Sequence, residues 1–385
     1  MFKLLKGGDC YIPEFIGKKD ILIAGKTICK IEDNIPVDNL WDVEKFDCTG
    51  KIVCPGFIDQ HLHITGGGGE QGPSSRIPEL MLGEIIKAGV STVVGVLGVD
   101  DISRNIAGLL AKARALEIEG VTTYIYTGSY GVPTATLTGR VISDISLIDK
   151  VIGVGEIAIA DYRASHRSLE MLKGLAYEAK VGGLLGAKAG VMHMHVGDGK
   201  EGLKELFLLV EESDFPIDMF VPTHLNRNKA LFEQSINYAE AGGNIDLTAG
   251  EASGQGLSVP EALEILVRKG INMDKVTVSS DGNGSIPGDG TSGSGVGKVV
   301  QLFNDIKTSI TDKKIEITQA LKTVTSNVAK VLKLYPQKGI LQAGSDADIL
   351  VLDKSSLNID LMLGNGDLCV KDGKVIKRGK YENRG

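Results

Sequence analysis

Residues 55–70 read PGFIDQHLHITGGGGE, and the architecture of the chain can be worked out from this segment. An apolar run ends in two histidines one residue apart, His61 and His63, and a glycine tract leads on to Glu70. Side chains one residue apart on a strand point to the same face. The pair can therefore bring two imidazoles to one point at a strand tip, either as metal ligands or as hydrogen-bonded core histidines.

This segment opens a series of eight apolar runs that alternate with helical stretches. Within 102–118, for example, Leu109, Ala113 and Leu116 recur at helical spacing. Eight strands alternating with helices favour a (β/α)8 barrel over an open doubly wound sheet, and no GxGxxG motif follows the first strand. The apolar runs lie at 51–59, 91–97, 121–126, 151–159, 190–196, 218–223, 244–248 and 275–280, and the helical stretches lie near 78–88, 102–118, 167–181, 200–213, 229–242, 258–269 and 316–334.

The two chain ends have a different pattern, that of short strands joined by turns. DILIAGKTICKIED (20–33) is rich in β-branched residues and is broken by a turn at Ala24-Gly25-Lys26, and Asp372-Gly373 is a hairpin signal. Because the ends of a barrel chain often lie near one another, we expect them to form one small β-sandwich domain. The expected domains are 1–54 plus 338–385 for the sandwich and 55–337 for the barrel.

Composition narrows the classes of partner and location. The chain has 385 residues and a net charge of −7, and no Lys/Arg cluster indicates nucleic-acid binding. No run reaches the roughly 18 apolar residues of a membrane span, and the polar N-terminus does not resemble a signal peptide. Five cysteines without a CxxC motif predict reduced, buried thiols in a cytoplasmic protein.

Further metal-binding side chains stand where predicted strands end. The carboxyl ends of barrel strands meet at one face, which is where barrel enzymes carry their chemistry. In the fifth strand, His195 lies nearer the strand end than His193, so His193 is expected to lie deeper. The expected metal ligands are His61, His63, His195, His224 and Asp281.

Glu156 is the candidate that would bridge two metal ions. It stands inside the apolar run VIGVGEIAI, where an ionised side chain is costly unless it is paired or ligating. An internal salt bridge is the alternative explanation. Asp161 is the rival bridge, but it lies beyond the run, where a loop or capping role is easier. His166, in the loop-like ADYRASH, is expected at the surface.

Taken together, these segments resemble the amidohydrolase superfamily and, within it, the isoaspartyl dipeptidase family. PGFIDQHLH, the histidines that end the fifth and sixth strands, SSDGNGS and GSDADILVLD carry the first resemblance. HITGGGGEQGP, TGSYGVPT, KVGGLLGAKAG, THLNRN and SSDGNGS carry the second, which covers nearly the full length.

The resemblance implies metal-dependent hydrolysis of β-aspartyl dipeptides by a metal-bound hydroxide, with two Zn2+ per subunit. It also suggests a homo-oligomer, of which an octamer is one form. It assigns the general base and acid to Asp281, carbonyl polarisation to Tyr130, the substrate's amino group to Glu70, carboxylates to Arg163 and Arg227, and further contacts to Gly68 and Ser285.

The chain departs from the family at two positions. The family's strand-4 bridge is a carboxylated lysine, but Glu156 stands there and Lys150 precedes the strand. A glutamate has a shorter arm yet still supplies two oxygens, so we expect a Glu156-bridged pair, with a single-metal enzyme as the alternative. Val99 stands where the family tends to have threonine, which removes one substrate hydrogen bond.

The residues leave two other functions open. One is a cyclic-amide hydrolase, such as a dihydroorotase or hydantoinase, which has no need of a carboxylate for an amino group. The other is a metal-free scaffold. One acid and two arginines at the barrel mouth favour a small zwitterion with carboxylates. The glycine-rich stretch 282–297 is open between a lid and a flexible loop.

Overall fold

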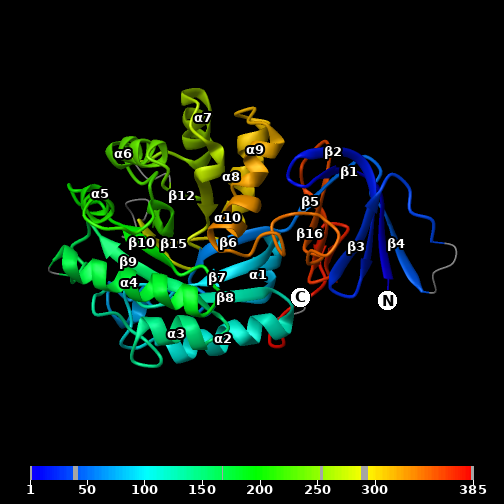
Figure 1. Ribbon diagram of the computed structural model, residues 1–385. Coiled ribbons are helices and arrows are strands. Elements are labelled where there is room, and N and C mark those ends of the chain that lie inside the picture. Colours follow the sequence, from blue (N-terminus) through cyan, green and yellow to red (C-terminus); the bar gives the residue numbers. More distant parts are fainter. Residues whose placement is uncertain (1, 38–41, 167, 252–254, 288–293, 383–385) are drawn as a thin grey trace.

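The structure is a computed structural model that describes residues 2–37, 42–166, 168–251, 255–287 and 294–382. Its larger part is a barrel of parallel strands with helices on the outside (Figure 1). The barrel strands are β6 (Phe57–Leu62), β7 (Val90–Gly95), β8 (Thr122–Thr127), β9 (Val151–Ile159), β10 (Val191–Val196), β11 (Phe220–Thr223), β12 (Ile245–Thr248) and β13 (Val276–Ser279).

Six of these strands, β6 to β11, pair in sequence order as one parallel sheet, and β12 pairs with β13. Backbone hydrogen bonds connect the two groups beyond the strand ends. The amide of Leu225, after β11, donates to Asp246 of β12 over 3.3 Å, and the amide of His63, after β6, donates to Gly282, after β13, over 3.0 Å. The eight predicted runs therefore form one ring, as expected for the (β/α)8 barrel.

The helices alternate with the strands, with three differences from the sequence prediction. Short α3 lies between β8 and β9 and was not predicted, α8 was also missed, and the predicted helix over 316–334 is two helices. The helices are α1 (Leu82–Lys87), α2 (Ile106–Glu119), α3 (Val141–Leu147), α4 (Leu169–Leu185), α5 (Lys204–Glu211), α6 (Lys229–Glu240), α7 (Val259–Lys269), α8 (Val300–Thr311), α9 (Ile317–Lys322) and α10 (Ser326–Val331).

Alternate strand residues pack on opposite sides of the sheet. Val93 and Ile125 join the large core beneath the outer helices. Val94 and Tyr126, each one residue further along, join a second core that includes Leu332, which follows α10. Successive residues of the strands thus pack alternately against the outer helices and into the second core. No described helix has both the length and the apolar character needed to cross a membrane.

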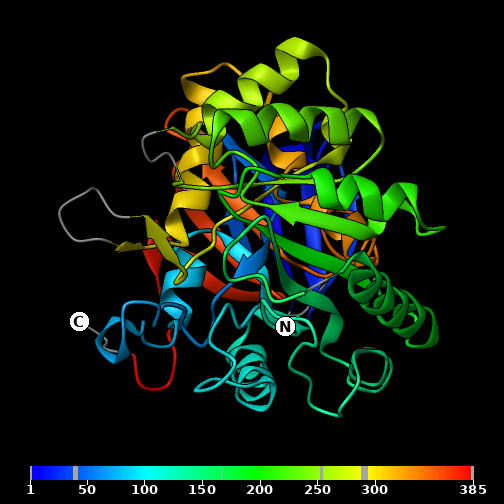
Figure 2. The ribbon, with the colours of Figure 1, turned by 90° about the vertical axis from the view of Figure 1, so that its left-hand side faces the viewer.

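Strands from the two chain ends form a separate lobe (Figure 1), which lies behind the barrel in Figure 2. Its nine strands belong to one hydrogen-bonded sheet in the order β19-β18-β17-β16-β5-β1-β2-β3, with β4 paired to β1. Their association is confirmed, while a two-layer sandwich stays a prediction. The strands are β1 (Phe2–Tyr11), β2 (Phe15–Ala24), β3 (Thr27–Glu32), β4 (Val43–Asp47), β5 (Lys51–Pro55), β16 (Ile349–Asp353), β17 (Ile359–Gly364), β18 (Asp367–Lys371) and β19 (Lys374–Val375).

The predicted first run, 51–59, belongs to both parts of the molecule. β5 pairs with β1 and β16 in the terminal sheet, and β6 begins the barrel after Gly56. A side chain at position 56 would meet Ser91 Oγ at 2.5 Å, so only glycine fits at this crossing. The treatment of 51–59 as one strand was wrong, because an apolar run does not say which sheet its residues join.

Candidate active site

The six predicted metal-binding side chains lie together at the carboxyl ends of the barrel strands. His61 is in β6 and His63 just after it, Glu156 is in β9, His195 is near the end of β10, and His224 and Asp281 follow β11 and β13. All six are buried. His224 and Asp281 have positive φ angles of 64° and 48°, where the chain turns out of the strands.

Glu156 reaches this place through an irregularity in β9. Met192 of β10 pairs with Val154, whereas Met194 pairs with Ile157, so β9 holds one extra residue between them. Such a bulge re-aims side chains. Gly155 makes it possible, because a side chain there would meet His193 Cβ and its carbonyl oxygen at 2.8 Å.

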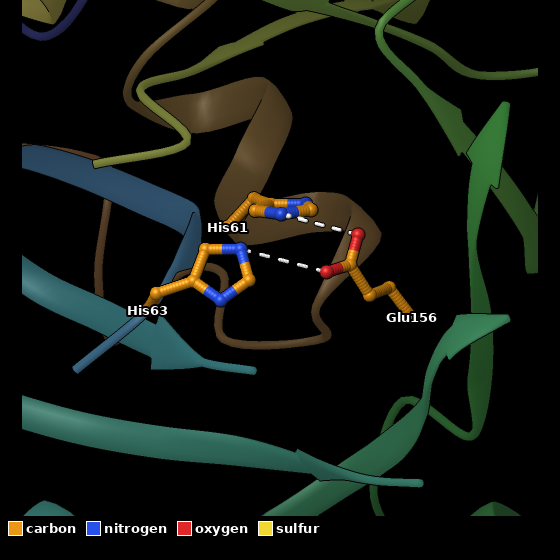
Figure 3. A group of neighbouring side chains, drawn as sticks. All are labelled: His61, His63 and Glu156. Atoms are coloured by element: carbon orange, nitrogen blue, oxygen red, sulfur yellow. Dashed lines mark ion pairs between the residues drawn. The ribbon is translucent and has the colours of Figure 1, made fainter. Parts of the chain in front are cut away.

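The Glu156 carboxylate faces the HxH pair, as Figure 3 shows. Oε1 lies 3.5 Å from His63 Nε2, and Oε2 lies 3.4 Å from His61 Nε2. Asp281 Oδ1 approaches the same two nitrogens at 3.1 and 3.4 Å. Two imidazoles and two carboxylates therefore surround one point.

A second group forms on the other side of the same carboxylate. Glu156 Oε2 lies 3.2 Å from His195 Nδ1 and 4.0 Å from His224 Nε2. Three sets of ligand atoms each lie within 4.8 Å of one another, and Glu156 belongs to two of them. The sets are His61, His63 and Glu156; His61, His224 and Asp281; and Glu156, His195 and His224.

The chemistry of these donors fits metal ions. His61 Nε2, Glu156 Oε1 and Asp281 Oδ1 are buried and have no hydrogen-bond partner among the described residues. Buried polar atoms without partners are costly, and a cation would satisfy all three lone pairs at once. Imidazole nitrogens with carboxylate oxygens are a set that zinc accepts. These residues therefore fit a metal site, although their roles as ligands stay a prediction.

The charges at the site reinforce one another. Burial alone would raise the pKa of Glu156, but the imidazoles of His61 and His195 hold that pKa well below its usual range. Burial works against a charged His61, yet Glu156 and Asp281 raise its pKa to about 9, so the two carboxylates favour positive charge at this point, which a bound metal ion would supply in place of the proton. Asp281 is held well below its ordinary pKa by His61 and His63 despite its burial. Both carboxylates are thus kept ionised.

His193 lies deeper than the ligand group, as expected from its place in β10. Its Nε2 is 2.7 Å from His61 Nδ1, and its ring stacks on Tyr126 at a centroid distance of 5.0 Å. Burial lowers the pKa of His193 well below its ordinary value, so it is neutral. With His61 Nδ1 engaged in this bond, His61 Nε2 is left for the pocket.

Above the ligands opens a cavity of about 560 Å3. Glu70 stands at one side, where its Oε1 accepts a hydrogen bond from Ser285 Oγ at 3.0 Å and lies 3.3 Å from Arg163 Nη1. The predicted substrate-binding residues all line this one cavity. The lining includes Gly68, Glu70, Val99, Tyr130, Arg163, Arg227 and Ser285.

Both predicted carboxylate-binding arginines are themselves paired with carboxylates. Arg163 holds Asp161 through two bonds, Nε to Oδ1 at 2.9 Å and Nη2 to Oδ2 at 2.7 Å. Arg227 Nε donates to Glu251 Oε1 at 2.5 Å. These pairs fix the two guanidinium groups beside His195, whose Nε2 lies 3.3 and 3.4 Å from them. Asp161 Oδ1 also accepts the backbone amide of Arg163 at 2.8 Å, so Asp161 holds the turn of the loop, as expected, and orients the Arg163 side chain as well.

Tyr130 lies over the same histidine. Its hydroxyl is 2.9 Å from His195 Nδ1, and the Arg163 guanidinium carbon is 4.9 Å from the centre of its ring. Burial raises the Tyr130 pKa well above its ordinary value, so the phenol keeps its proton and can donate it in a hydrogen bond.

His166, Lys150 and the glycine-rich stretch 282–297 lie outside the group of predicted metal ligands. His166 is not a surface residue, since its side chain is 7 % exposed and its Nε2 lies 2.8 Å from Glu205 Oε1. Lys150 is bound to Glu117 at 2.8 Å, away from the ligand group. Of the stretch 282–297, residues 288–293 lie outside the described residues. Its flanks, β14 (Ser285–Pro287) and β15 (Ser294–Val296), pair as an antiparallel hairpin.

Glu251 is a site residue that the sequence did not reveal. It follows β12 in the segment AGEASG, outside any motif or strand pattern, and its carboxylate touches both His224 and Arg227. In the sequence, the only signal was a glutamate three residues after the predicted strand 244–248.

Comparison with known proteins identifies the family. Residues 258–380 match the family model described as the amidohydrolase family. Over 100 % of both chains, the structure matches the β-aspartyl dipeptidase of Fervidobacterium islandicum AW-1, solved in complex with a β-Asp-Leu dipeptide, at 41 % identity and a TM-score of 0.92. This chain belongs to the β-aspartyl dipeptidase family.

Other relatives share less with this β-aspartyl dipeptidase family member. A dihydropyrimidinase from Brevibacillus agri NCHU1002 is 16 % identical, covers 98 % of this chain and 97 % of its own, and has a TM-score of 0.69, which shows the fold alone. An imidazolonepropionase of Bradyrhizobium sp. BTAi1 is 36 % identical over 97 residues. The chain spans about a quarter of that relative's length, because the match covers 24 % of each protein.

Proposed function

We propose that this amidohydrolase hydrolyses the isopeptide bond of β-aspartyl dipeptides at a centre of two zinc ions bridged by Glu156. The observation that carries the proposal is the position of the Glu156 carboxylate, with one oxygen toward His63 and the other toward His195. The full-length likeness to a β-aspartyl dipeptidase solved with β-Asp-Leu supports the choice of substrate.

One ion would be held by His61, His63, Glu156 and Asp281, and the other by Glu156, His195 and His224. When bound, the ions supply Lewis-acid chemistry: they lower the pKa of a coordinated water toward ~7 and polarise the scissile carbonyl. Glu156 would contribute its carboxylate to both ions, and it would need no carbon dioxide, which a carboxylated lysine requires.

Asp281 is the proton carrier in this proposal. Its Oδ1 lies 3.1 Å from His63 Nε2 and has no hydrogen-bond partner among the described residues. As a carboxylate beside the proposed metal pocket, Asp281 would accept a proton from the attacking water and deliver it to the leaving amine. Tyr130 keeps its proton and donates a hydrogen bond to the developing oxyanion, a contact whose loss typically costs ~2.7–4 kcal/mol.

The cavity wall supplies recognition of the substrate. Glu70 would receive the α-amino group, and Ser285 and the Arg163 side chain orient its carboxylate. Arg163 and Arg227 would take the two carboxylates of the dipeptide, since guanidinium groups suit bidentate recognition. Gly68, with φ at +71°, exposes its backbone to the cavity.

Turnover of a substrate panel tests this function. Purified protein with zinc is offered β-Asp-Leu, α-Asp-Leu, dihydroorotate and hydantoin, and product formation is followed by chromatography. We expect cleavage of β-Asp-Leu alone. Turnover of the cyclic amides without the dipeptide would establish the rival hydrolase. A protein that binds no zinc when zinc is supplied, and that turns over none of the compounds, would establish the scaffold.

We also propose the coarser organisation around this site. A sandwich of 1–54 with 338–385 is supported by one buried core that joins Ile28 of β3 to Leu363 of β17, at opposite parts of the sheet order. A homo-oligomer is supported by exposed Leu147, Leu184 and Leu185 at the ends of α3 and α4. Free cysteines are in keeping with the cytoplasm.

A further inference from the structure

Glu251 connects the two halves of the site. Its side chain is 2 % exposed and lies between a predicted metal ligand and a predicted substrate-binding arginine. Oε1 accepts the hydrogen bond from Arg227 Nε at 2.5 Å, and Oε2 lies 3.4 Å from His224 Nδ1. Asp161 makes a comparable pair of contacts elsewhere in the site, with Arg163 Nη2 at 2.7 Å and His195 Nε2 at 3.3 Å, whereas Glu251 is the carboxylate that joins His224 to Arg227.

We propose that Glu251 is a positioning residue that couples the metal pocket to the substrate-carboxylate clamp. The inference rests on the proposed function, since it assumes a metal at His224 and a carboxylate at Arg227. Glu251 itself lines neither the ligand group nor the cavity, so it acts through these two residues.

Its first effect is on the tautomer of His224. The imidazole can hold a metal through Nε2 only if that nitrogen carries no proton, so the proton must sit on Nδ1. Thr248 Oγ1 lies 2.8 Å from Nδ1, and Glu251 Oε2 adds a negative charge at 3.4 Å. Oε2 has no hydrogen-bond partner among the described residues, so no other donor neutralises its charge, and this charge favours a proton on Nδ1 of His224.

Its second effect is on Arg227. Nε is held by Glu251, and Nη1 donates to the carbonyl of Val196 at 3.0 Å. Two of the three guanidinium nitrogens are thus fixed, and the plane of the group is set. Because the side chain lines the cavity, the remaining edge is presented to a substrate carboxylate in a fixed orientation.

The test compares Glu251→Gln with Asp305→Asn in the full-length protein. Gln keeps the size of the side chain but removes the charge. Asp305 is the matched control: its Oδ2 accepts the amide of Gly250 at 3.0 Å, so it anchors the same segment without touching the site. Two measurements are made: zinc affinity by competition with a chromophoric chelator, and KM and kcat on β-Asp-Leu and on its two carboxamide analogues.

For Glu251→Gln we expect zinc affinity to fall about 10–100-fold, the usual cost of losing the outer partner of a ligating histidine. The variant's KM for β-Asp-Leu should rise above that of the wild-type enzyme. For the carboxamide analogue that lacks the carboxylate bound by Arg227, the variant and the wild-type enzyme should have the same KM. Asp305→Asn should lower thermal stability alone. Glu251→Asp, which restores the charge, should recover part of the affinity.

Unchanged zinc affinity and KM in Glu251→Gln would overturn the inference, as would equal losses in Asp305→Asn. If the Gln variant does not fold, Glu251→Asp decides: zinc affinity and KM both at wild-type levels with lowered stability would mean a structural role alone. The zinc measurement needs no turnover. Wild-type protein that binds zinc but cleaves no β-aspartyl dipeptide would therefore refute the proposed function, while the zinc affinity of the Glu251 variants would still test the positioning role.

Discussion

Glu156 Oε2 of β9 lies 3.2 Å from His195 Nδ1 of the neighbouring parallel strand β10. The pairing of these two strands is irregular just before this contact, because β9 holds one extra residue between Val154 and Ile157. The extra residue in β9 turns the glutamate into the barrel mouth. This contact joins the two groups of predicted ligands, and the bulge offsets the shorter arm of a glutamate at a position where the family resemblance implies a carboxylated lysine.

Glu156→Gln tests the bridge. Loss of an outer partner already costs about 10–100-fold in activity, so loss of the bridge itself should cost more, and bound zinc should fall from two ions per chain. Elemental analysis and β-Asp-Leu turnover measure both. Glu233→Gln, at an exposed pair with Lys269, is the control.

The same bridge predicts indifference to bicarbonate. A carboxylated lysine needs dissolved carbon dioxide, whereas Glu156 needs none. Activity in carbonate-free buffer should equal that with added bicarbonate, and intact mass should show no carboxylated lysine. A bicarbonate requirement would contradict the Glu156 bridge.

Glu70→Gln should weaken recognition of the substrate's amino group. Glu70 is oriented by Ser285 at 3.0 Å, and hydrogen bonds to charged groups contribute about 1.5–3 kcal/mol. We therefore expect a drop of about 10–100-fold in kcat/KM for β-Asp-Leu. Glu79→Gln, which alters an exposed carboxylate paired with Lys112, should change nothing. Equal kinetics for Glu70→Gln and wild type would remove Glu70 from the site.

Lys338 links the end of the barrel to the terminal sheet. Its ammonium lies 2.6 Å from Asp348 and 2.8 Å from Asp346, and its side chain is 3 % exposed. Lys338→Met would leave the Asp348 charge buried without its partner, which typically costs about 3–5 kcal/mol in the free energy of unfolding. Urea denaturation measures it.

The control for that variant is Lys30→Met. Lys30 pairs with Glu32 at 2.9 Å, and both side chains are exposed, so we expect a change of about 0–1 kcal/mol. Equal effects of the two substitutions would show that Lys338 does not stabilise the junction.

The buried thiols predict a loss of stability in alkali. Burial raises the pKa of Cys48 from 9.0 to about 11, with Lys51 acting in the opposite direction. Its contribution to stability is therefore fully present below pH 9 and is lost as pH rises through about 11, since the unfolded chain ionises first. Cys48→Ala should flatten this part of the stability curve. A curve identical to wild type between these pH values would refute the contribution.

Local signals in the sequence were sufficient for part of the fold. The turn at Gly25 joins β2 to β3, and Asp372-Gly373 joins β18 to β19, as predicted, because turn chemistry is encoded in adjacent residues. The apolar pattern of the run 51–59 did not show that it forms two strands, since the sheet that a strand joins depends on residues far along the chain.

The candidate site divides in the same way. His61 and His63 could be predicted because they form a pair on one face of a strand, and Glu156 because it is a charged residue in an apolar run. Glu251 could not be found so, because its role depends on Arg227, which is distant in sequence and adjacent only in the fold. His166 was misplaced for the same reason: its partner Glu205 belongs to α5.

Removal and return of metal tests the central claim most directly. Protein treated with a chelator and dialysed should lose β-Asp-Leu hydrolysis, and activity should return as zinc is added up to two equivalents per chain. Full hydrolysis by protein shown to be metal-free would contradict the account.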